Sequence, residues 1–393
     1  MFLFPYNNQS VEITACNFKN NSAHQAGAVW HRGGGSSGIP DSEYPLSAMP
    51  ENTSLLFNSN VFDSNASATQ AGALFLSYCN INEIHTCTFK NNTASLGGSI
   101  YLLTNRAFTL KNCTFNNNTA NNAGAMDLGN ATAAVNVINC TFANNIANQY
   151  GGAISVPQNT TTINITNCTF ANNQANNPGN GQSGAIHSGN NLANSTVTIK
   201  NSIFFNNTVT NPWSVWKHCN SNLNDGGNNI FFPENAGGRC VATPNPLIVD
   251  PLLLPLANNG GATQTMALSV GSPAIDAGSG CPMQDQRGFM RVGACDIGAF
   301  EFNGVLNTTN FEITTNSLSV YPNPSKNGLL FVKLPQQIDD SGAKIEVYSI
   351  DGKLILEKVF FDQSFNLSLA QKGFYVLKTT TSTKAYLNKI IVE

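Results

Sequence analysis

Apolar and polar residues in the first two hundred or so positions follow a repeating unit rather than one continuous pattern. A six-residue motif recurs as CNFKNN at Cys16, NVFDSN at Asn60, CTFKNN at Cys87, CTFNNN at Cys113, CTFANN at Cys140 and Cys168, and SIFFNN at Ser202. The shared aromatic residues are Phe18, Phe62, Phe89, Phe115, Phe142, Phe170 and Phe204. Their regular spacing is 26 to 28 residues, with insertions in the first and last intervals. A period of this length indicates a solenoid.

Two further elements complete each unit. A small-residue motif (AGAV, AGAL, GGSI, AGAM, GGAI or SGAI) follows each phenylalanine except the last, and apolar residues at alternate positions, such as Val135 and Val137, precede the cysteines. Alternation with a period of two predicts strands, and no unit contains a helical pattern. Each unit therefore predicts three short strands, which stack on neighbouring units at about 4.8 Å per turn. The fold class we expect is all-β, a right-handed parallel β-helix over residues 1–243.

The motif also predicts directions for its side chains. Residues two apart in a strand share a face, so we place both positions of the CxF motif inside. The inner cysteines are Cys16, Cys87, Cys113, Cys140 and Cys168. Asn112, Asn139 and Asn167 precede three of them and are expected to bend the chain in the left-handed conformation. Thr141 is expected to face outward.

A second set of asparagines lies two positions after the phenylalanines. Its members are Asn20, Asn91, Asn117, Asn144, Asn172 and Asn206. Stacked amide side chains can hydrogen-bond along the solenoid axis and satisfy the turns. We therefore predict a ladder of asparagine side chains at this corner.

The later part of the chain changes texture twice. Residues 244–302 are dense in Pro and Gly, and we expect them to cap the solenoid, because an open end exposes apolar residues and strand edges. Residues 303–317 are polar and predict a linker. Residues 318–393 contain alternating strands with Asn-Gly and Asp-Gly turns, which are typical of a small β-sandwich.

Composition and charge exclude several classes of protein. Charged residues make up 10% of the 393 residues, against about 25% in ordinary globular proteins. The net charge of -3, without a basic block, gives no nucleic-acid-binding surface. No apolar run approaches the roughly 18 residues of a transmembrane helix. The opening MFLFPYNNQS is not a signal peptide and leads straight into a repeat at Val11, so we expect the natural chain to extend further upstream.

The motifs resemble three known families. FKNN, FANN, GGAI and SGAI, over about residues 11–210, are similar to the repeats of chlamydial polymorphic membrane proteins, which implies a β-helix and an adhesin-like surface protein. NPLIVDPLL, GSPAIDAG, DQRG and CDIGAFE resemble the choice-of-anchor segment of secreted bacterial β-helix proteins. The C-terminal residues 318–393 resemble the type A sorting domain of the type IX secretion system of Bacteroidota.

The sorting-domain resemblance is specific. It rests on YPNP, IxVYSxDGK, GxYVLK and the terminal KIIVE. The residues that carry it are Tyr321, Pro322, Asn323, Pro324, Gly352, Gly373 and Lys389. The resemblance implies the type IX machinery as a partner, export across the outer membrane, and surface attachment, with cell-surface lipopolysaccharide as a candidate partner after sorting.

Catalysis is the alternative, because many parallel β-helices act on polysaccharides. Such chemistry needs clustered carboxylates, often with Ca²⁺, or a base on one face. The acidic residues between 51 and 210 are Glu51, Asp63, Glu83 and Asp127, with Arg106 as the one arginine. They occupy different positions in the repeat and are not expected to stack, so no catalytic or cofactor-binding residue is assigned. The insertion that carries His31, Arg32, Asp41 and Glu43 is the remaining place for a site, although a plain surface loop is favoured.

The remaining cysteines and acids predict structural roles. The cysteines of the motif are expected to act as small buried apolar residues. Cys219 with Cys240, and Cys281 with Cys295, are the candidate disulfides of an exported protein. Asp276, Asp285, Asp296 and Glu301 could offer oxygen ligands to Ca²⁺. The absence of DxD spacing weakens this reading, and an internal ion pair in the Asp-Gln-Arg-Gly segment is favoured. No cofactor is therefore expected.

The sequence leaves two functions open. Regular rungs, sparse charge and long Asn and Thr faces favour a non-catalytic surface protein, adhesin-like or structural, with a carbohydrate or extracellular-matrix ligand. The alternative is a polysaccharide-active enzyme of the pectate-lyase-like kind. No nucleic-acid partner is expected.

Overall fold

The computed structural model describes residues 2–3, 11–32, 55–77, 81–104, 107–131, 133–157, 162–189, 196–213, 217–220, 223–234, 240, 247–306, 318–334, 343–349, 353–360, 362–380 and 385–393. They form two compact units, residues 1–306 and 307–393. The described residues contain no helix, and hence none with the length and hydropathy needed to cross a membrane. The all-β class predicted from the sequence is confirmed.

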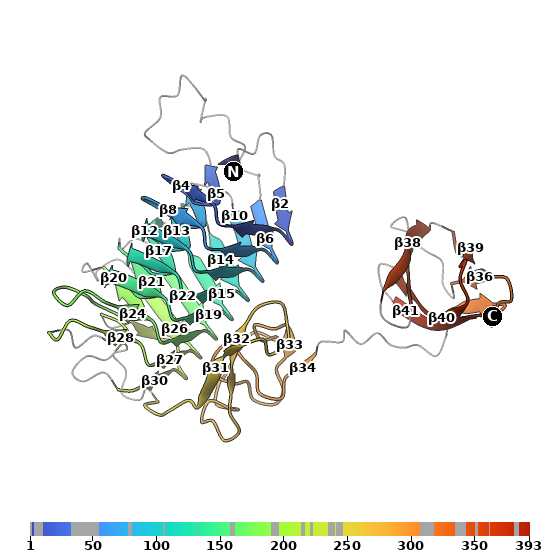
Figure 1. The fold of residues 1–393 in the computed structure, drawn as a ribbon. Helices are drawn as coiled ribbons and strands as arrows, with labels where there is room; N and C mark the ends of the chain where they lie inside the picture. Colours follow the sequence, from blue (N-terminus) through green and yellow to red (C-terminus); the bar gives the residue numbers. More distant parts are fainter. Residues whose placement is uncertain are drawn as a thin grey trace. The chain divides into compact units, whose positions relative to one another are not determined.

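The first unit is a right-handed parallel β-helix, in which each turn of the chain contributes one strand to each of four parallel sheets (Figure 1). Sheet 1 contains β2 (Val11–Thr14), β6 (Leu55–Asn58), β10 (Ile81–His85), β14 (Phe108–Lys111), β18 (Val135–Ile138), β22 (Thr162–Thr166), β26 (Thr196–Lys200) and β29 (Asn224–Asp225). Sheet 2 contains β3 (Asn17–Lys19), β7 (Val61–Asp63), β11 (Thr88–Lys90), β15 (Thr114–Asn116), β19 (Thr141–Ala143), β23 (Thr169–Ala171), β27 (Ile203–Phe205) and β30 (Ile230–Phe232).

The other two sheets close each turn. Sheet 3 contains β4 (Ser22–Ala23), β8 (Ala66–Ser67), β12 (Thr93–Leu96), β16 (Thr119–Asn122), β20 (Ile146–Tyr150), β24 (Gln174–Ala175) and β28 (Thr208–Val209). Sheet 4 contains β1 (Phe2–Leu3), β5 (Val29–Arg32), β9 (Leu74–Ser77), β13 (Ile100–Thr104), β17 (Met126–Ala131), β21 (Ile154–Val156) and β25 (Ile186–Ser188). The sequence predicted three strands per turn, and this was wrong by one. Sheet 3 escaped notice because its inward residues, such as Ala120 and Ala147, are small.

The phenylalanines of the motif form one column in the core. Rings on successive turns stack almost parallel, with centroids 4.7 Å apart for Phe89 and Phe115 and 4.8 Å apart for Phe142 and Phe170. The column extends one turn further than predicted, to Phe231. Its first member, Phe18, is half-buried, and Cys16 beside it is exposed, contrary to the expectation that both lie inside.

Three corners in each turn use the left-handed conformation: the residue before the cysteine, the second residue after the phenylalanine and the first residue of the small-residue motif. The residue before the cysteine does so as predicted, with a φ of 56° at Asn112 and 49° at Asn139. The first residue of the small-residue motif does so as well, as at Gly151. The next residue of that motif is always glycine, because a Cβ at Gly124 would overlap the carbonyl oxygen of Gly152 in the neighbouring turn.

The asparagine ladder lies one residue later than predicted. The predicted residues have φ between 49° and 57°, and they turn the chain rather than stack inside. The next residue points inward and bonds along the axis, so that Asn145 Oδ1 accepts from the backbone nitrogen of Asn118 at 3.1 Å and from its Nδ2 at 2.9 Å. The buried amide ladder consists of Asn65, Asn92, Asn118, Asn145, Asn173 and Asn207.

Residues 247–306 lie along the flank of the solenoid. Leu247 adds a bridge to Ile230, after which β31 (Leu253–Ala257) and β32 (Thr265–Leu268) pair antiparallel and pack on the outer face of sheet 2 (Figure 1). Thr141 faces outward as expected, yet it is fully buried, because the flanking segment covers it. Its hydroxyl donates to Gln286 Oε1 of that segment at 2.6 Å. The strands β33 (Phe289–Met290) and β34 (Val305–Leu306) pair within this segment, so part of the predicted linker is ordered here.

The second unit is a small β-sandwich of antiparallel sheets. One sheet contains β35 (Ser319–Tyr321), β36 (Leu329–Lys333) and β39 (Ser364–Ser368). The other contains β38 (Leu354–Phe360), β37 (Ala343–Ser349), β40 (Gly373–Thr380) and β41 (Ala385–Val392). Val332, Val347 and Leu377 are among the residues of its separate core.

Candidate functional site

The acidic residues singled out in the repeats lie on different sheets, as the sequence predicted. Asp63 is on sheet 2, where Lys90 Nζ lies 3.4 Å from its carboxylate. Glu83 is on sheet 1, paired with Lys111 at 2.7 Å. Asp127 is on sheet 4 and has no ion pair among the described residues. These acids do not form a catalytic cluster.

Several candidates fall elsewhere. Glu51, Arg106, Asp41 and Glu43 lie outside the described residues. His31 is in β5, where it is 2% exposed, and burial lowers its pKa to about 4. The side chain of His31 is therefore part of the solenoid interior rather than an exposed loop.

The outer face of sheet 4 carries the most unusual column of side chains in the described solenoid. One position of the repeat holds, in successive turns and in strict register, Trp30, Phe75, Tyr101, Asp127, Ser155 and His187. Trp30 and Phe75 stack with centroids 5.4 Å apart, and Tyr101 meets Phe75 edge-on at 5.3 Å. The column thus passes from aromatic residues to an acid, a hydroxyl and an imidazole.

A hollow of about 430 Å³ lies beside the polar half of this column. Its lining residues are Leu96, Tyr101, Asn122, Asp127, Gly129, Tyr150, Ser155, Pro157, Gln182, His187 and Gly189. Leu96, Asn122, Tyr150 and Gln182 form the opposite column, at the ends of strands in sheet 3 or in register with them. The hollow therefore runs along the corner between sheets 3 and 4, and neighbouring turns build it together.

Three buried polar atoms in this lining have no hydrogen-bond partner within the described part of the chain: Asn122 Oδ1, Asp127 Oδ1 and His187 Nδ1. Burial raises the pKa of the Asp127 carboxyl to about 8. Burial also lowers the pKa of His187 to about 4, and its ring stacks on Tyr150 with centroids 4.7 Å apart. Both groups are therefore uncharged at neutral pH, and they can donate or accept hydrogen bonds to a ligand.

The sequence pattern could have indicated this site. The motif that ends sheet-4 corners is followed by one variable position, read as AGAVW, AGALF, GGSIY, AGAMD, GGAIS and SGAIH. This position does not belong to the constant part of the repeat, so it does not stand out in the motif. Binding surfaces commonly arise at variable positions on a constant scaffold. Of the six residues, only Asp127 is among the candidates that the sequence indicated.

The cysteines of the motif form a hydrogen-bonded column rather than a purely apolar one. Cys140 Sγ accepts from the backbone nitrogen of Cys113 at 3.5 Å and lies 3.2 Å from the carbonyl oxygen of Ile138, to which it donates. In two turns another residue replaces the cysteine as acceptor. Asn60 Oδ1 accepts from the backbone nitrogen of Cys16 at 2.8 Å, and Ser202 Oγ accepts from the backbone nitrogen of Cys168 at 3.2 Å. Burial raises the pKa of the Cys113 thiol. At Cys140 burial acts in the same direction, but hydrogen bonds from neighbouring groups outweigh it and lower the pKa of the thiol.

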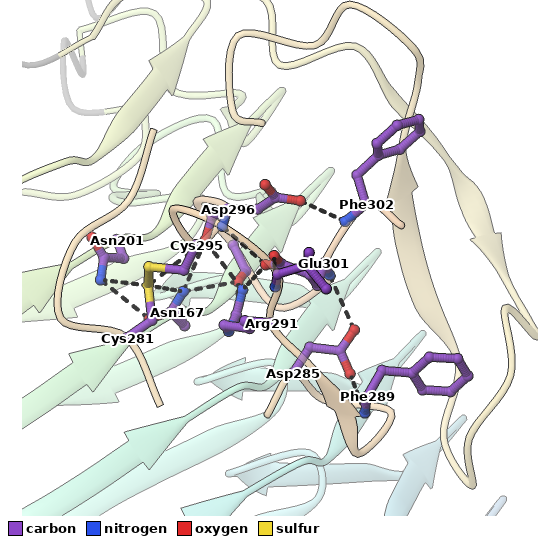
Figure 2. A network of polar contacts seen from close by, with 12 residues as sticks. Asn167, Asn201, Cys281, Asp285, Phe289, Arg291, Cys295, Asp296, Glu301 and Phe302 are labelled. Carbon is purple, nitrogen blue, oxygen red and sulfur yellow. Dashed lines mark hydrogen bonds and ion pairs between the residues drawn. A yellow bond between two sulfur atoms is a disulfide. The ribbon is translucent and has the colours of Figure 1, made fainter. Parts of the chain in front are cut away.

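The other four cysteines are paired in the structure. Cys219 bonds to Cys240, with Cα atoms 5.3 Å apart, and Cys281 bonds to Cys295, with Cα atoms 6.3 Å apart. The second disulfide lies against the solenoid, where Asn201 Nδ2 is 3.2 Å from Cys281 Sγ (Figure 2).

The acidic residues of the flanking segment meet arginines. Arg287 lies 2.7 Å from Asp285 and is held between the rings of Phe289 and Phe300. Arg291 lies 2.8 Å from Glu301 (Figure 2). The ion pair predicted in the Asp-Gln-Arg-Gly segment is confirmed. No group of three or more metal-ligating side chains occurs within the described part of the chain. Guanidinium groups thus neutralise two of the four carboxylates, those of Asp285 and Glu301.

Residues of the C-terminal motifs hold the sandwich together. Asn323 Nδ2 donates to the carbonyl oxygen of Lys389 at 2.7 Å, and Asn323 Oδ1 accepts from the backbone nitrogen of Ile391 at 2.9 Å. Tyr321 pairs with Phe331, and Gly373 begins β40 opposite Val392. Pro322 and Pro324 flank Asn323 in the same segment, and Gly352 lies outside the described residues. The YPNP motif is thus fastened to the last strand.

Comparison with known families agrees with this arrangement. Residues 319–393 match the secretion system C-terminal sorting domain. The protein is therefore exported by the type IX secretion system and attached to the cell surface. Residues 86–102 and 139–157 match the repeat of the chlamydial polymorphic membrane proteins. No curated protein and no solved structure is detectably similar to the chain.

Proposed function

We propose that this exported protein is a non-catalytic, adhesin-like surface protein that binds extracellular carbohydrate along the outer face of sheet 4. The observation that carries the proposal is the in-register column of Trp30, Phe75 and Tyr101, which continues into the hollow beside Asp127. Aromatic faces with a few convergent polar groups are the usual composition of a ligand site. A turn spacing of about 4.8 Å offers repeated contacts to an extended polymer.

The surroundings favour binding over turnover. A glycosidase needs a pair of carboxyl groups about 5–10 Å apart, and among the described lining residues only Asp127 carries a carboxyl group. A lyase for acidic polysaccharides needs Ca²⁺ or a cationic side chain beside the substrate carboxylate. The lining residues that the structure describes include no Lys or Arg. The chemistry needed for either reaction is thus incomplete in these residues.

A binding assay tests the proposal. The full chain is screened against neutral and anionic polysaccharides and extracellular-matrix proteins, and hits are measured by titration calorimetry. Tyr101→Ala, which removes the aromatic ring at the edge of the hollow, should weaken carbohydrate binding at least tenfold. Glu83→Gln, on sheet 1, is the control and should bind as the parent does. Equal binding by the parent and Tyr101→Ala would contradict the location.

A polysaccharide-active enzyme is the second candidate, because Asp127 has the raised pKa of a general acid. The same polysaccharides are incubated with the protein, with and without Ca²⁺, and new reducing or unsaturated ends are measured. Product that appears with the parent and is lost in Asp127→Asn would support the enzyme and overturn the binding proposal.

The wider setting of the protein is also a proposal. The resemblance of residues 244–302 to choice-of-anchor segments and the type IX signal support an origin in Bacteroidota, with lipopolysaccharide as the surface anchor. Treatment that strips lipopolysaccharide from cells expressing the tagged protein should then release it.

A further inference from the structure

The hollow beside Asp127 concentrates unsatisfied polar atoms. Asn122 Oδ1, Asp127 Oδ1 and His187 Nδ1 are buried and have no partner among the residues that the structure describes, and all three residues line the same space. Asp127 is 3% exposed and His187 is 8% exposed, so both residues are more than nine-tenths buried. Buried polar groups in folded proteins are nearly always hydrogen-bonded, and convergence of exceptions in one hollow points to a ligand.

We propose that this hollow is a subsite for an uncharged sugar unit, which discriminates against uronate and other acidic glycans. This inference rests on the carbohydrate binding proposed above and adds the class of ligand. It concerns residues of four successive turns. Tyr101, Asp127, Ser155 and His187 lie in register on sheet 4, and Tyr150 belongs to the opposite column.

The pattern of donors and acceptors fits hydroxyl groups. The amide oxygen of Asn122 only accepts, whereas a protonated carboxyl and a neutral imidazole can each donate or accept. A hydroxyl group offers both a donor and lone pairs, so a polyhydroxylated ring can satisfy all three residues. Asp127 and His187 are two turns apart, or about 9.6 Å along the axis, with Ser155 between them. That span accommodates a pyranose ring, and the aromatic rings of Tyr101 and Tyr150 line the same hollow.

Charge explains the expected discrimination. None of the described residues that line the hollow is Lys or Arg. Burial lowers the pKa of His187 to about 4, so the imidazole supplies no positive charge at neutral pH. A ligand carboxylate placed there would lose its water without gaining a cation, and it would lie beside the carboxyl of Asp127. Burial of an unpaired charge is strongly unfavourable.

The test uses the full chain and matched oligosaccharides. Hexamers of mannose, glucose and galactose are compared with the hexamers of the corresponding uronic acids, which differ only in oxidation at C6. Titration calorimetry at pH 7 gives the dissociation constant of each hexamer. For the sugar that binds, the neutral hexamer should bind at least tenfold more tightly than its uronic acid counterpart. Equal or tighter binding of the uronate would overturn the subsite. Failure of every hexamer, together with failure of the polysaccharide screen, would overturn the proposed function itself and the subsite with it.

Variants separate the subsite from the rest of the surface. Asp127→Ala should weaken the neutral hexamer about three- to tenfold, as expected for one lost hydrogen bond. Gln182→Arg places a cation at the rim and should narrow the preference against the uronate. Glu83→Gln is the control outside the hollow. If Tyr101→Ala abolishes binding while Asp127→Ala and Gln182→Arg change nothing, carbohydrate binding stands and the subsite is wrong. The comparison of hexamers with the parent protein does not depend on the folding of any variant.

Discussion

At the scale of single residues, the protein depends on what each side chain offers to the turn above or below it. Phe142 contributes only a ring to the core column, whereas Cys140 and Asn145 contribute polar atoms that satisfy the backbone of the preceding turn. Asp127, by contrast, satisfies nothing at its free oxygen. The first three residues are explained by the solenoid, and Asp127 is explained better by a ligand.

Phe142→Ala should lower the free energy of unfolding by about 3–5 kcal/mol, because a fully buried ring is replaced by a cavity. Thr141→Ala removes a buried hydroxyl that donates to Gln286, and it should cost about 1–3 kcal/mol rather than nothing. Denaturant unfolding of both variants measures these values. An unchanged Thr141→Ala protein would contradict the packing of the flanking segment on sheet 2.

Cys140→Ser should be tolerated better than Cys140→Ala, because serine keeps an acceptor for the backbone nitrogen of Cys113. Alanine leaves that buried donor unsatisfied, at a cost of about 1–3 kcal/mol. Ser202 already plays this role one turn above Cys168. Thermal unfolding of both variants in reducing buffer gives the comparison. If the alanine variant is the more stable, the column acts only through apolar packing.

Asp127→Asn should stabilise the protein by an amount that increases with pH. Burial raises the folded-state pKa of Asp127 from 3.8 to about 8, so the folded state holds a proton that the unfolded state has released between those values. Stability therefore falls as pH rises through this window, by up to about 1.4 kcal/mol per pH unit. Asparagine removes this dependence.

The pH series for Asp127→Asn is read as a difference between variant and parent, measured by denaturant unfolding from pH 4.5 to 8. The difference cancels the opposite contributions of His31, His187 and His218, whose pKa values burial lowers to about 4. A flat difference for Asp127→Asn would mean that Asp127 ionises freely and that the hollow is better solvated than its burial implies.

At the scale of the strand and corner, the most regular element is the amide ladder. Asn145 Oδ1 accepts two hydrogen bonds from Asn118, and its Nδ2 donates to the carbonyl oxygen of Phe115 at 3.0 Å and to Asn173 Oδ1 at 2.9 Å. Its neighbour Asn144 has a φ of 57° and serves the turn through its backbone. Two adjacent asparagines thus have different tasks.

Asn145→Ala should therefore cost about 2–4 kcal/mol, since several buried groups lose their partners together. Asn144→Gly is the matched change, and it should cost less than about 1 kcal/mol, because glycine adopts the left-handed conformation without strain. Chemical denaturation compares the two. Similar losses for both variants would refute the separation of turn and ladder.

Periodicity carries much of this element-level structure in the sequence. Large inward residues at alternate positions predicted the strands of sheet 1 and sheet 2. The small-residue motif predicted the corner before sheet 4. Sheet 3 was missed because Ala94, Ala120 and Ala147 give no apolar contrast. The ladder was displaced by one residue because the left-handed corner at Asn144 reverses the inward direction after Phe142. Contacts across the chain, such as Thr141 with Gln286, leave no local pattern at all.

The hollow was harder to predict than the fold for a related reason. Trp30, Tyr101, Asp127 and His187 are unlike one another, so no motif unites them. Only a fixed register on sheet 4 brings them into one column. Asp127 is buried, and the residues that line the hollow with it, such as Tyr101 and Tyr150, come from other turns.

At the scale of the whole molecule, the chain combines a repetitive β-helix, which presents an extended surface, with a C-terminal sorting domain, which directs export. The solenoid can carry a different side chain in every turn without a change of fold, since each turn contacts mainly its neighbours. The C-terminal sandwich has its own core and its own compact unit. Loss of the second unit should therefore leave the first folded.

Deletion of residues 318–393 should abolish surface display and leave a folded β-helix in the periplasm. The reason is that residues 319–393 match the sorting domain, while the cores of the two units are separate. The chain, given a signal peptide, is expressed in a host with type IX secretion, and surface protein is measured by antibody labelling of intact cells.

A milder variant, Asn323→Ala, loses the bonds to Lys389 and Ile391 and should lower display in proportion to the unfolding of the sandwich. Phe142→Ala, which weakens only the solenoid core, is the control for instability in general. Surface labelling that survives the deletion would show that the address lies elsewhere in the chain.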